Sequence, residues 1–309
     1  MYLLIIIFIC CCFLIFTIDL NKSLEYEKFE NINIDIGNRM SGYFFNLGSS
    51  IMKKQEFKND TDYTGTPFFE NLPKHISYNS EKFDNIHDAF ISENINSDFF
   101  ISDCNGCSAW EITNNKIYHF WKIMRPLVHS IMDETFLKSN LKKQVDYPII
   151  HFRCADTPFI KQNGYHLQYY KFFKTALDKI TDKSNIKYSK VILMSCNTHN
   201  SNINNQTACV EYTDSLKQYL NEIGYECDVM CGTNIDDFAM LFYAPAVIST
   251  SSSFSFMSGF FGKGVFLITE DTNGKCTDCS EVMLNGYNLM HENIEDYLNT
   301  NDVIQLLRK

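Results

Sequence analysis

Short apolar runs alternate with amphipathic segments over the second half of this 309-residue chain, and the alternation restricts the folds that the chain can adopt. The runs predict strands at 147–152, 190–195, 226–230, 246–250 and 264–268. The segments between them predict helices at about 166–180 and 211–223, a short helix after 233 and another near 254–261. Strands joined by helices form right-handed crossovers and a parallel sheet covered on both faces. We therefore expect residues 146–290 to form a Rossmann-like α/β domain, followed by C-terminal helices at 291–309.

The first half of the chain gives weaker signals. Residues 21–97 are polar and rich in Asn, which predicts a stem followed by irregular structure, and residues 98–145 would complete an N-terminal domain. Within that domain, 98–102 is expected to be a short strand and 114–137 a helix with one apolar face. Pro126 falls inside the helix, so we expect the helix to be kinked or split there.

An uncharged apolar run fills residues 1–18, which is near the minimum length for a membrane-spanning helix. An uncleaved anchor at 1–20 is favoured over a cleaved signal peptide or a peripheral segment, because no basic residue precedes the run and no small-residue cleavage site follows it. Sequons at Asn21, Asn59 and Asn205 favour a lumenal body in the Golgi or endoplasmic reticulum, whereas Lys22 mildly disfavours it. We expect a single-pass membrane protein with a lumenal body.

Twelve cysteines are divided between the apolar N-terminus, which holds three, and the rest of the chain, which holds nine. Nine is odd, so at least one thiol stays free if the others pair. An oxidising lumen favours disulfides, and the pairs considered are Cys196–Cys209 or Cys227–Cys231. The alternative is a structural zinc site formed by two distant pairs. Those pairs are Cys104 with Cys107 and Cys276 with Cys279.

Charge and histidine placement exclude some classes of function. The formal net charge is −10 and the isoelectric point is near 5.3, which argues against a nucleic-acid-binding protein because such proteins need a basic face. One local basic site for a small anion is still compatible with this charge. His119 and His129 lie near the apolar face of the helix at 114–137, where we expect structural histidines rather than metal ligands.

Polar groups follow the first predicted strand at close spacing: His151, Arg153 and Asp156. In an α/β sheet, ligands bind at the carboxyl ends of parallel strands. An arginine at such a position offers a planar fork of donors that suits phosphate. The competing interpretation is a surface ion pair between Arg153 and Asp156.

A serine-rich turn follows the strand at 246–250. It places hydroxyls and backbone N–H groups before a helix, which is a favourable arrangement for an anion, although serines are also common helix caps. Together with Arg153 on a second strand end, this turn would hold a diphosphate without a metal ion. The chain contains neither a Gly-x-Gly-x-x-Gly fingerprint nor a Walker loop.

Two segments carry a family resemblance. His151-Phe-Arg153-Cys-Ala-Asp156 resembles the His-x-Arg-Arg-x-Asp motif of the fucosyltransferases that share a GT-B fold, in the α1,2/α1,6 and protein O-fucosyltransferase branches. Residues 246–259 are similar to their Ile-Ser-x-Ser-Ser-Phe-Ser-x-x-Gly segment, and Asp236-Asp237 to the short acidic helix before it. The resemblance implies a GT-B-like arrangement of two Rossmann-like domains. Residues 146–290 would bind the nucleotide sugar, and 98–145 would belong to the acceptor-side domain.

The resemblance also implies a donor site. In that family the arginine of the first motif contacts the β-phosphate of GDP-fucose, which by match is Arg153. The implied donor-binding residues are Arg153, Ser251, Ser252, Ser253, Phe254 and Asp237. Cys154 stands where the family has its second arginine. This departure would weaken stabilisation of the leaving group or change the donor.

The implied activity is metal-independent, inverting transfer of a sugar, with L-fucose from GDP-fucose as the leading donor and a glycan or glycoprotein as acceptor; no cofactor is needed. Arg153 would stabilise the diphosphate leaving group, and Asp156 or His151 would accept the proton of the acceptor hydroxyl. Asp156 is equally suited to orient Arg153, in which case the base lies in the N-terminal half. Acidic residues available there are Glu111, Asp133 and Glu134.

Other interpretations stay open at this point. The same fold would serve a transferase that uses a different nucleotide sugar. A protein of another class, a membrane-tethered glycan- or nucleotide-binding protein without turnover, is kept open by Cys154 in place of an arginine. A structural ectodomain stabilised by cysteines is the third alternative, and it would bind no nucleotide sugar.

Overall fold

The fold lies in the second of two units into which the chain divides, Met1–Ile36 and Gly37–Lys309. The computed structural model describes residues 36–59, 66–102, 114–154, 157, 159, 166–196, 202–250, 252–269, 276–289 and 299–309. The expected anchor at 1–20, the sequon at Asn21, and the cysteines Cys104 and Cys107 lie outside these ranges, whereas the sequon at Asn205 lies in the described helix Ile203–Glu222. Among the described residues, no helix has the length and apolar character needed to cross a membrane.

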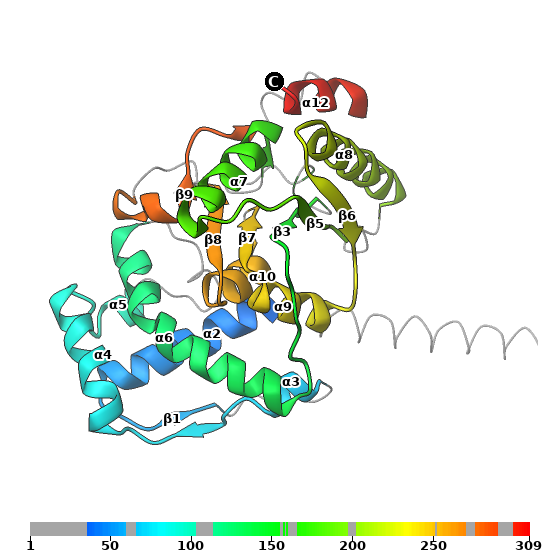
Figure 1. Ribbon diagram of the computed structural model, residues 1–309. Coiled ribbons are helices and arrows are strands. Elements are labelled where there is room, and N and C mark those ends of the chain that lie inside the picture. Colours follow the sequence, from blue (N-terminus) through cyan, green and yellow to red (C-terminus); the bar gives the residue numbers. More distant parts are fainter. Residues whose placement is uncertain are drawn as a thin grey trace, which may run out of the picture. The chain divides into compact units, whose positions relative to one another are not determined.

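A six-stranded sheet, parallel at every pairing, forms the centre of the second unit, in the order β6-β5-β3-β7-β8-β9 (Figure 1). The chain starts at the middle strand, moves to one edge, returns to the middle and continues to the other edge. This is the strand order of a doubly wound dinucleotide-binding fold. The strands are β3 (Ile149–His151), β5 (Lys190–Met194), β6 (Glu226–Met230), β7 (Ala246–Ser249), β8 (Val265–Thr269) and β9 (Met283–Leu284). The predicted Rossmann-like α/β sheet is confirmed.

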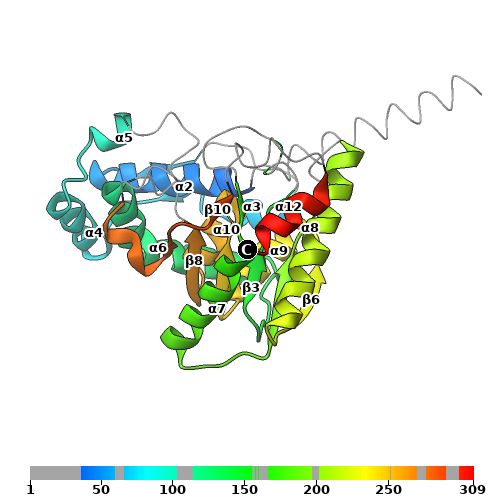
Figure 2. The ribbon, with the colours of Figure 1, turned by 90° about the horizontal axis from the view of Figure 1, so that it is seen from above.

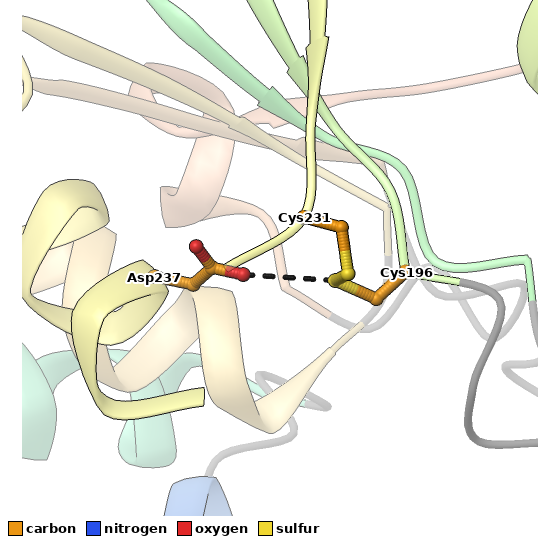
Figure 3. Close-up of side chains that lie close together, drawn as sticks. All are labelled: Cys196, Cys231 and Asp237. Carbon is orange, nitrogen blue, oxygen red and sulfur yellow. Dashed lines mark hydrogen bonds between the residues drawn. A yellow bond between two sulfur atoms is a disulfide. The ribbon is translucent and has the colours of Figure 1, made fainter. Parts of the chain in front are cut away.

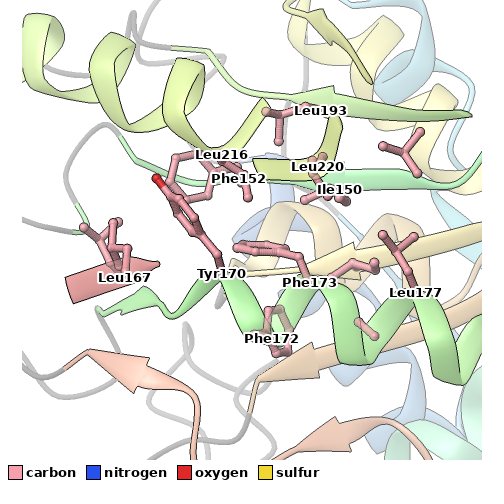
Figure 4. Packing of buried hydrophobic residues seen from close by; sticks show 14 of the residues in the cluster. Ile150, Phe152, Leu167, Tyr170, Phe172, Phe173, Leu177, Leu193, Leu216 and Leu220 are labelled. Atoms are coloured by element: carbon pink, nitrogen blue, oxygen red, sulfur yellow. The ribbon is translucent and has the colours of Figure 1, made fainter. Parts of the chain in front are cut away.

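One face of the sheet is covered by α7 (Tyr170–Ser184), α8 (Ile203–Glu222) and α12 (Thr300–Leu307), and Figures 1 and 2 show α12 beside α8. Side chains alternate between the faces of a strand, so Ile150, Ile248 and Leu267 all point to this side. They pack against the apolar stripe of α7, including Phe173 and Leu177 (Figure 4). Each such buried side chain stabilises the fold by about 1.5–3 kcal/mol.

The opposite face is covered by α9 (Asn234–Tyr243), α10 (Ser253–Ser255) and the π-helical turn Phe256–Phe260. Gly259 sits so close to the sheet that a Cβ there would lie 2.8 Å from side-chain atoms of Phe266 and Val247. The helix α6 (Asn115–Lys138) packs on this side through Trp121, whose ring centroid is 5.4 Å from that of Phe261.

The helix α6 runs through Pro126 as one element, so of the two outcomes expected there, a kink or a split, the split does not occur. Proline inside a helix costs about 3 kcal/mol through the lost hydrogen bond and steric conflict. Buried side chains on both sides of the proline, among them Trp121, Met124 and Val128, offset that cost because each contributes a similar amount on burial.

The remaining described elements ahead of Tyr147 are helices and two short strands. They are α2 (Ile36–Met52), β1 (Phe57–Lys58), α3 (Pro67–Glu70), β2 (His75–Ile76), α4 (Ser80–Ser92) and α5 (Phe99–Ser102). β1 pairs with β2 in an antiparallel sheet, and this described region contains no parallel strands, so a second Rossmann-like domain stays a prediction. The long helix α2 occupies part of the segment that the sequence predicted to be irregular.

Phe99–Ser102 is a helix rather than the predicted strand. The Asn96 side chain accepts a hydrogen bond from the Phe99 backbone N–H and starts the turn. Phe99 and Phe100 then pack into an aromatic cluster with Phe45 and Phe120, at centroid separations of 5.0–5.7 Å. Tertiary packing therefore decides the conformation of a short apolar run that suits both helix and strand.

The cysteines pair differently from the prediction. The disulfides join Cys154 to Cys209, Cys196 to Cys231 and Cys276 to Cys279. Cys227 is a buried free thiol, because its position in β6 turns the side chain into the core. The predicted pairs Cys196–Cys209 and Cys227–Cys231 are therefore wrong. Cys276 and Cys279 are joined to each other, which is also not the zinc site that was considered as an alternative.

Candidate functional site

The carboxyl ends of β3 and β7 lie side by side at the centre of the sheet. His151, the last residue of β3, is in register with Ser249, the last residue of β7. The chain leaves these two strands toward opposite edges of the sheet, which makes their boundary the topological switch point. Ligands of doubly wound sheets bind in this position. Both predicted motifs, one after each strand, therefore meet here.

Thr250 joins the two strand ends. Its Oγ1 donates a hydrogen bond to the carbonyl of His151 at 3.0 Å and accepts one from the backbone N–H of Arg153 at 2.8 Å. Thr250 is fully buried, whereas its partners His151 and Arg153 are half-buried, so both bonds are partly shielded from water. The backbone of Arg153 is thereby fixed at the strand end, and its half-buried side chain starts from a defined position.

The hydroxyls of the serine turn, which we define as residues 249–255, fall into two groups. The hydroxyls of Ser249 and Ser255 hydrogen-bond to each other at 2.7 Å, so these two stabilise the conformation of the turn. Ser252 precedes α10 without a capping bond from its side chain, and Ser253 makes no side-chain hydrogen bond within the described chain. Ser252 and Ser253 are therefore the described hydroxyls of the turn that remain for a ligand. Ser251 lies outside the described residues, as does Asp156.

The ring of Phe254, in the serine turn, packs near two other aromatic rings. The ring centroid of Phe254 is 5.6 Å from that of His151 and 5.2 Å from that of Phe238 on α9. His151 is half-buried, so its imidazole stands beside the strand end rather than in the core. The structure thus brings together five of the predicted site residues: His151, Arg153, Ser252, Ser253 and Phe254.

The start of α2 also reaches this site, which the sequence did not suggest. A Cβ on Gly37 would lie 2.4 Å from the backbone N of Phe254 and 2.4 Å from the carbonyl carbon of Ser253. Only glycine allows this approach of the helix to the serine turn. The next residue, Asn38, has a buried side-chain Oδ1 without a hydrogen-bond partner among the described residues. A glycine in the first turn of a helix, followed by Asn and Arg, was the available signal.

We expect Gly37→Ala to lower the free energy of unfolding by about 1–3 kcal/mol, because backbone atoms rather than a flexible side chain must move. Denaturant unfolding measures this loss. The matched control is Ser41→Ala on the same helix, whose buried Oγ has no partner in the described part of the chain and can be removed at little cost. Equal effects of the two substitutions would contradict the close approach of α2.

Asp237 lies in the first turn of α9, which begins after Thr233 as the sequence predicted. The Thr233 Oγ1 accepts a hydrogen bond from the backbone N–H of Asp236, and Lys143 pairs with the Asp236 carboxylate at 2.6 Å. Asp237 is buried, and both of its carboxylate oxygens face the backbone N–H of Gly232 at 3.1–3.2 Å. Burial raises the pKa of Asp237, although the Gly232 N–H opposes this shift.

The raised pKa makes the stability contribution of Asp237 dependent on pH. The folded protein binds the proton of Asp237 more tightly than the unfolded chain does. The protonated carboxyl therefore contributes fully to the free energy of unfolding below the ordinary pKa of about 4, and this contribution is lost as pH rises through the raised pKa of the folded protein. Asp237→Asn is neutral at every pH. We expect its free energy of unfolding, relative to the wild type, to increase from pH 3 to pH 7 (approximate limits) in denaturant titrations. A difference that is constant with pH would count against this assignment.

Two acidic side chains of α6, which the sequence offered as candidate general bases, have other partners in the structure. Asp133 accepts a hydrogen bond from the Tyr243 hydroxyl at 2.8 Å, and Glu134 pairs with Lys138 on the surface. Both are therefore poor candidates for the general base, and Glu111 lies outside the described residues.

The histidines of α6 have structural partners, as expected. His129 donates to the Phe261 carbonyl at 2.8 Å, and its ring stacks on Phe242. The two ring nitrogens of His119 face Glu93 and Asp278, so this residue connects the end of α4 to the 3-10 turn Asp278–Glu281.

Fold and site together define a doubly wound α/β protein with an arginine and a serine turn at its switch point. No protein-family model matches the chain, and no curated protein or solved structure matches it.

Proposed function

We propose that the chain is a glycosyltransferase that transfers a sugar, L-fucose from GDP-fucose in the leading form of the proposal, to a glycan or glycoprotein. One observation carries it: Thr250 holds the ends of β3 and β7 together, so that Arg153 and the serine turn lie at one switch point. A guanidinium and nearby hydroxyls suit a diphosphate. The resemblance of residues 151–156 and 246–259 to the fucosyltransferase motifs supports the choice of donor.

The proposed chemistry follows from the charges at the site. The acceptor hydroxyl oxygen forms a bond to the anomeric carbon while the bond from that carbon to the diphosphate breaks. Arg153 stabilises the negative charge that develops on the diphosphate. In this proposal His151, at the end of β3, or Asp156 takes the proton of the acceptor hydroxyl.

The cellular setting belongs to the same proposal. The apolar run at 1–18 would anchor the chain as a single-pass membrane protein, with its body in the lumen of the Golgi or endoplasmic reticulum.

The helical region that contains α2 and α6 would take the acceptor-side role in a GT-B-like arrangement. The approach of Gly37 to the serine turn supports this role, because it brings that region to the strand ends.

A second function is favoured by one specific observation. Cys154, at the position of the family's second arginine, is buried and bonded to Cys209. This position therefore supplies packing and a cross-link instead of a positive charge. A protein that binds a nucleotide or glycan without turnover, or a transferase with another nucleotide sugar, accounts for that difference.

A thermal-shift and donor-hydrolysis panel tests the proposal. The full chain is mixed with several GDP- and UDP-sugars without added metal. A ligand at a hundred times its Kd stabilises the folded state by about 2.7 kcal/mol, which gives a measurable shift. Selective stabilisation by GDP-fucose with slow release of GDP supports the transferase. Stabilisation without release identifies the binding protein, and a flat response across the panel in folded protein excludes both.

A further inference from the structure

Two cysteines and one aspartate meet at the carboxyl edge of the sheet, on the side of β5 and β6. Cys196 lies just beyond β5, Cys231 follows β6 directly, and Asp237 comes from the first turn of α9. The two sulfurs and a carboxylate oxygen all lie within 4.8 Å of one another. Figure 3 shows the disulfide between the cysteines, with the Asp237 carboxylate directed at it.

The contact between Asp237 and Cys196 is between two acceptors in the oxidised protein. The Cys196 Sγ is 3.6 Å from the Asp237 Oδ2, but a disulfide sulfur carries no proton to donate. The described hydrogen-bond donor to the carboxylate is the single N–H of Gly232. Buried acceptors that face each other in this way are stabilised by a proton or a cation placed between them.

We propose that reduction of the Cys196–Cys231 disulfide creates a binding site for a thiophilic divalent cation such as Zn²⁺, with Cys196, Cys231 and Asp237 as ligands. In tetrahedral zinc sites the sulfur lies about 2.3 Å and the carboxylate oxygen about 2.0 Å from the ion, which places the two ligand atoms about 3.5 Å apart. The observed separation of 3.6 Å between the Cys196 Sγ and the Asp237 Oδ2 fits this geometry, and reduction lets the two bonded sulfurs move apart to take up separate ligand positions. The inference does not depend on the proposed glycosyl transfer.

The chemistry balances with a dithiol as reductant. The dithiol is oxidised to its own disulfide while Cys196 and Cys231 become thiols, so two electrons and two protons pass from one pair of sulfurs to the other. The cation then replaces both thiol protons, which are released to solvent, and binds the carboxylate of Asp237 as a third ligand. Cys231 is exposed, so this disulfide is open to the reductant, whereas Cys154 and Cys209 are buried.

Metal titration of the full chain tests the site, with Co²⁺ as the spectroscopic probe and Zn²⁺ as competitor. We expect the protein treated with dithiol to bind one ion with a sulfur-to-cobalt charge-transfer band, and the untreated protein to show no such band. Asp237→Asn should weaken binding by at least about tenfold. Cys196→Ala should remove the band, whereas Cys227→Ala, which changes the buried free thiol, should retain it.

Three results would overturn the proposal. The first is a band of equal strength in oxidised and reduced protein. The second is a band retained in Cys196→Ala, which places the ion at another cysteine pair. The third is the lack of binding by reduced protein whose circular dichroism matches the oxidised form. If Cys196→Ala fails to fold, Asp237→Asn identifies the site instead, because unchanged binding in that variant would also place the ion at another cysteine pair.

Discussion

Arg153→Ala is expected to lower the rate of GDP release from GDP-fucose by about 10²–10³-fold, the loss typical of removing one donor that stabilises a developing negative charge. Arg153 follows β3 at the switch point, where its backbone N–H donates to Thr250 of the serine turn. Rapid-quench or coupled measurement of GDP formation gives the rate. The thermal shift produced by GDP should fall in the same variant, because the phosphate contact is also a binding contact.

A matched arginine controls this experiment. Arg308, which directly follows α12, pairs with Glu222 at 2.9 Å on the surface of α8, on the helical layer away from the serine turn. Arg308→Ala should change GDP release by less than about twofold, since a surface ion pair contributes at most about 1 kcal/mol to stability. Equal rates for Arg153→Ala and wild type, in protein that unfolds at the same denaturant concentration, would refute the role of Arg153.

Removal of the Cys154–Cys209 disulfide should produce the largest loss of stability. The bond joins residues separated by 55 positions, and a loop of that length stabilises the folded state by about 4 kcal/mol through the entropy of the unfolded chain. We expect the double variant Cys154→Ala/Cys209→Ala to unfold about 8 °C below the wild type. Differential scanning calorimetry measures the shift.

Cys227→Ala is the control for the loss of a buried cysteine side chain without loss of a cross-link. We expect it to cost about 1 kcal/mol, the centre of the distribution for single substitutions. Similar losses in the double variant and in this control would show that the cross-link between the end of β3 and α8 contributes little. The double variant also reports on the site, because Cys154 follows Arg153 directly.

The sheet was predictable because its strands are continuous apolar runs. Val191–Leu193 and Val247–Ile248 are buried on both faces, so their sequences carry the signal of a parallel sheet without ambiguity. β9 has two residues, too few to show a period. The helix α2 was missed because Ser41 and Gly48 interrupt its apolar side. The side chains that pack against it, such as Phe120 beside Gly48, come from distant parts of the chain.

The residues of the site and the strand ends that carry them were predictable, whereas the contacts that join them were not. Arg153 and the serine turn each follow a strand, and the sequence shows this directly. Their proximity depends on the pairing of β3 with β7, which is a tertiary contact. The partner of Cys154 depends on α8 crossing over the end of β3, and the contact of Gly37 depends on how α2 docks. Local patterns contain no information on such distant contacts.

The most direct test of the switch-point site is a crystal structure of the chain with bound GDP. We expect the β-phosphate between the Arg153 guanidinium and the hydroxyls of Ser252 and Ser253, with nitrogen–oxygen distances of about 2.7–2.9 Å to the guanidinium. A nucleotide bound away from the carboxyl ends of β3 and β7 would contradict the account. So would crystals grown at saturating GDP in which these strand ends hold no nucleotide.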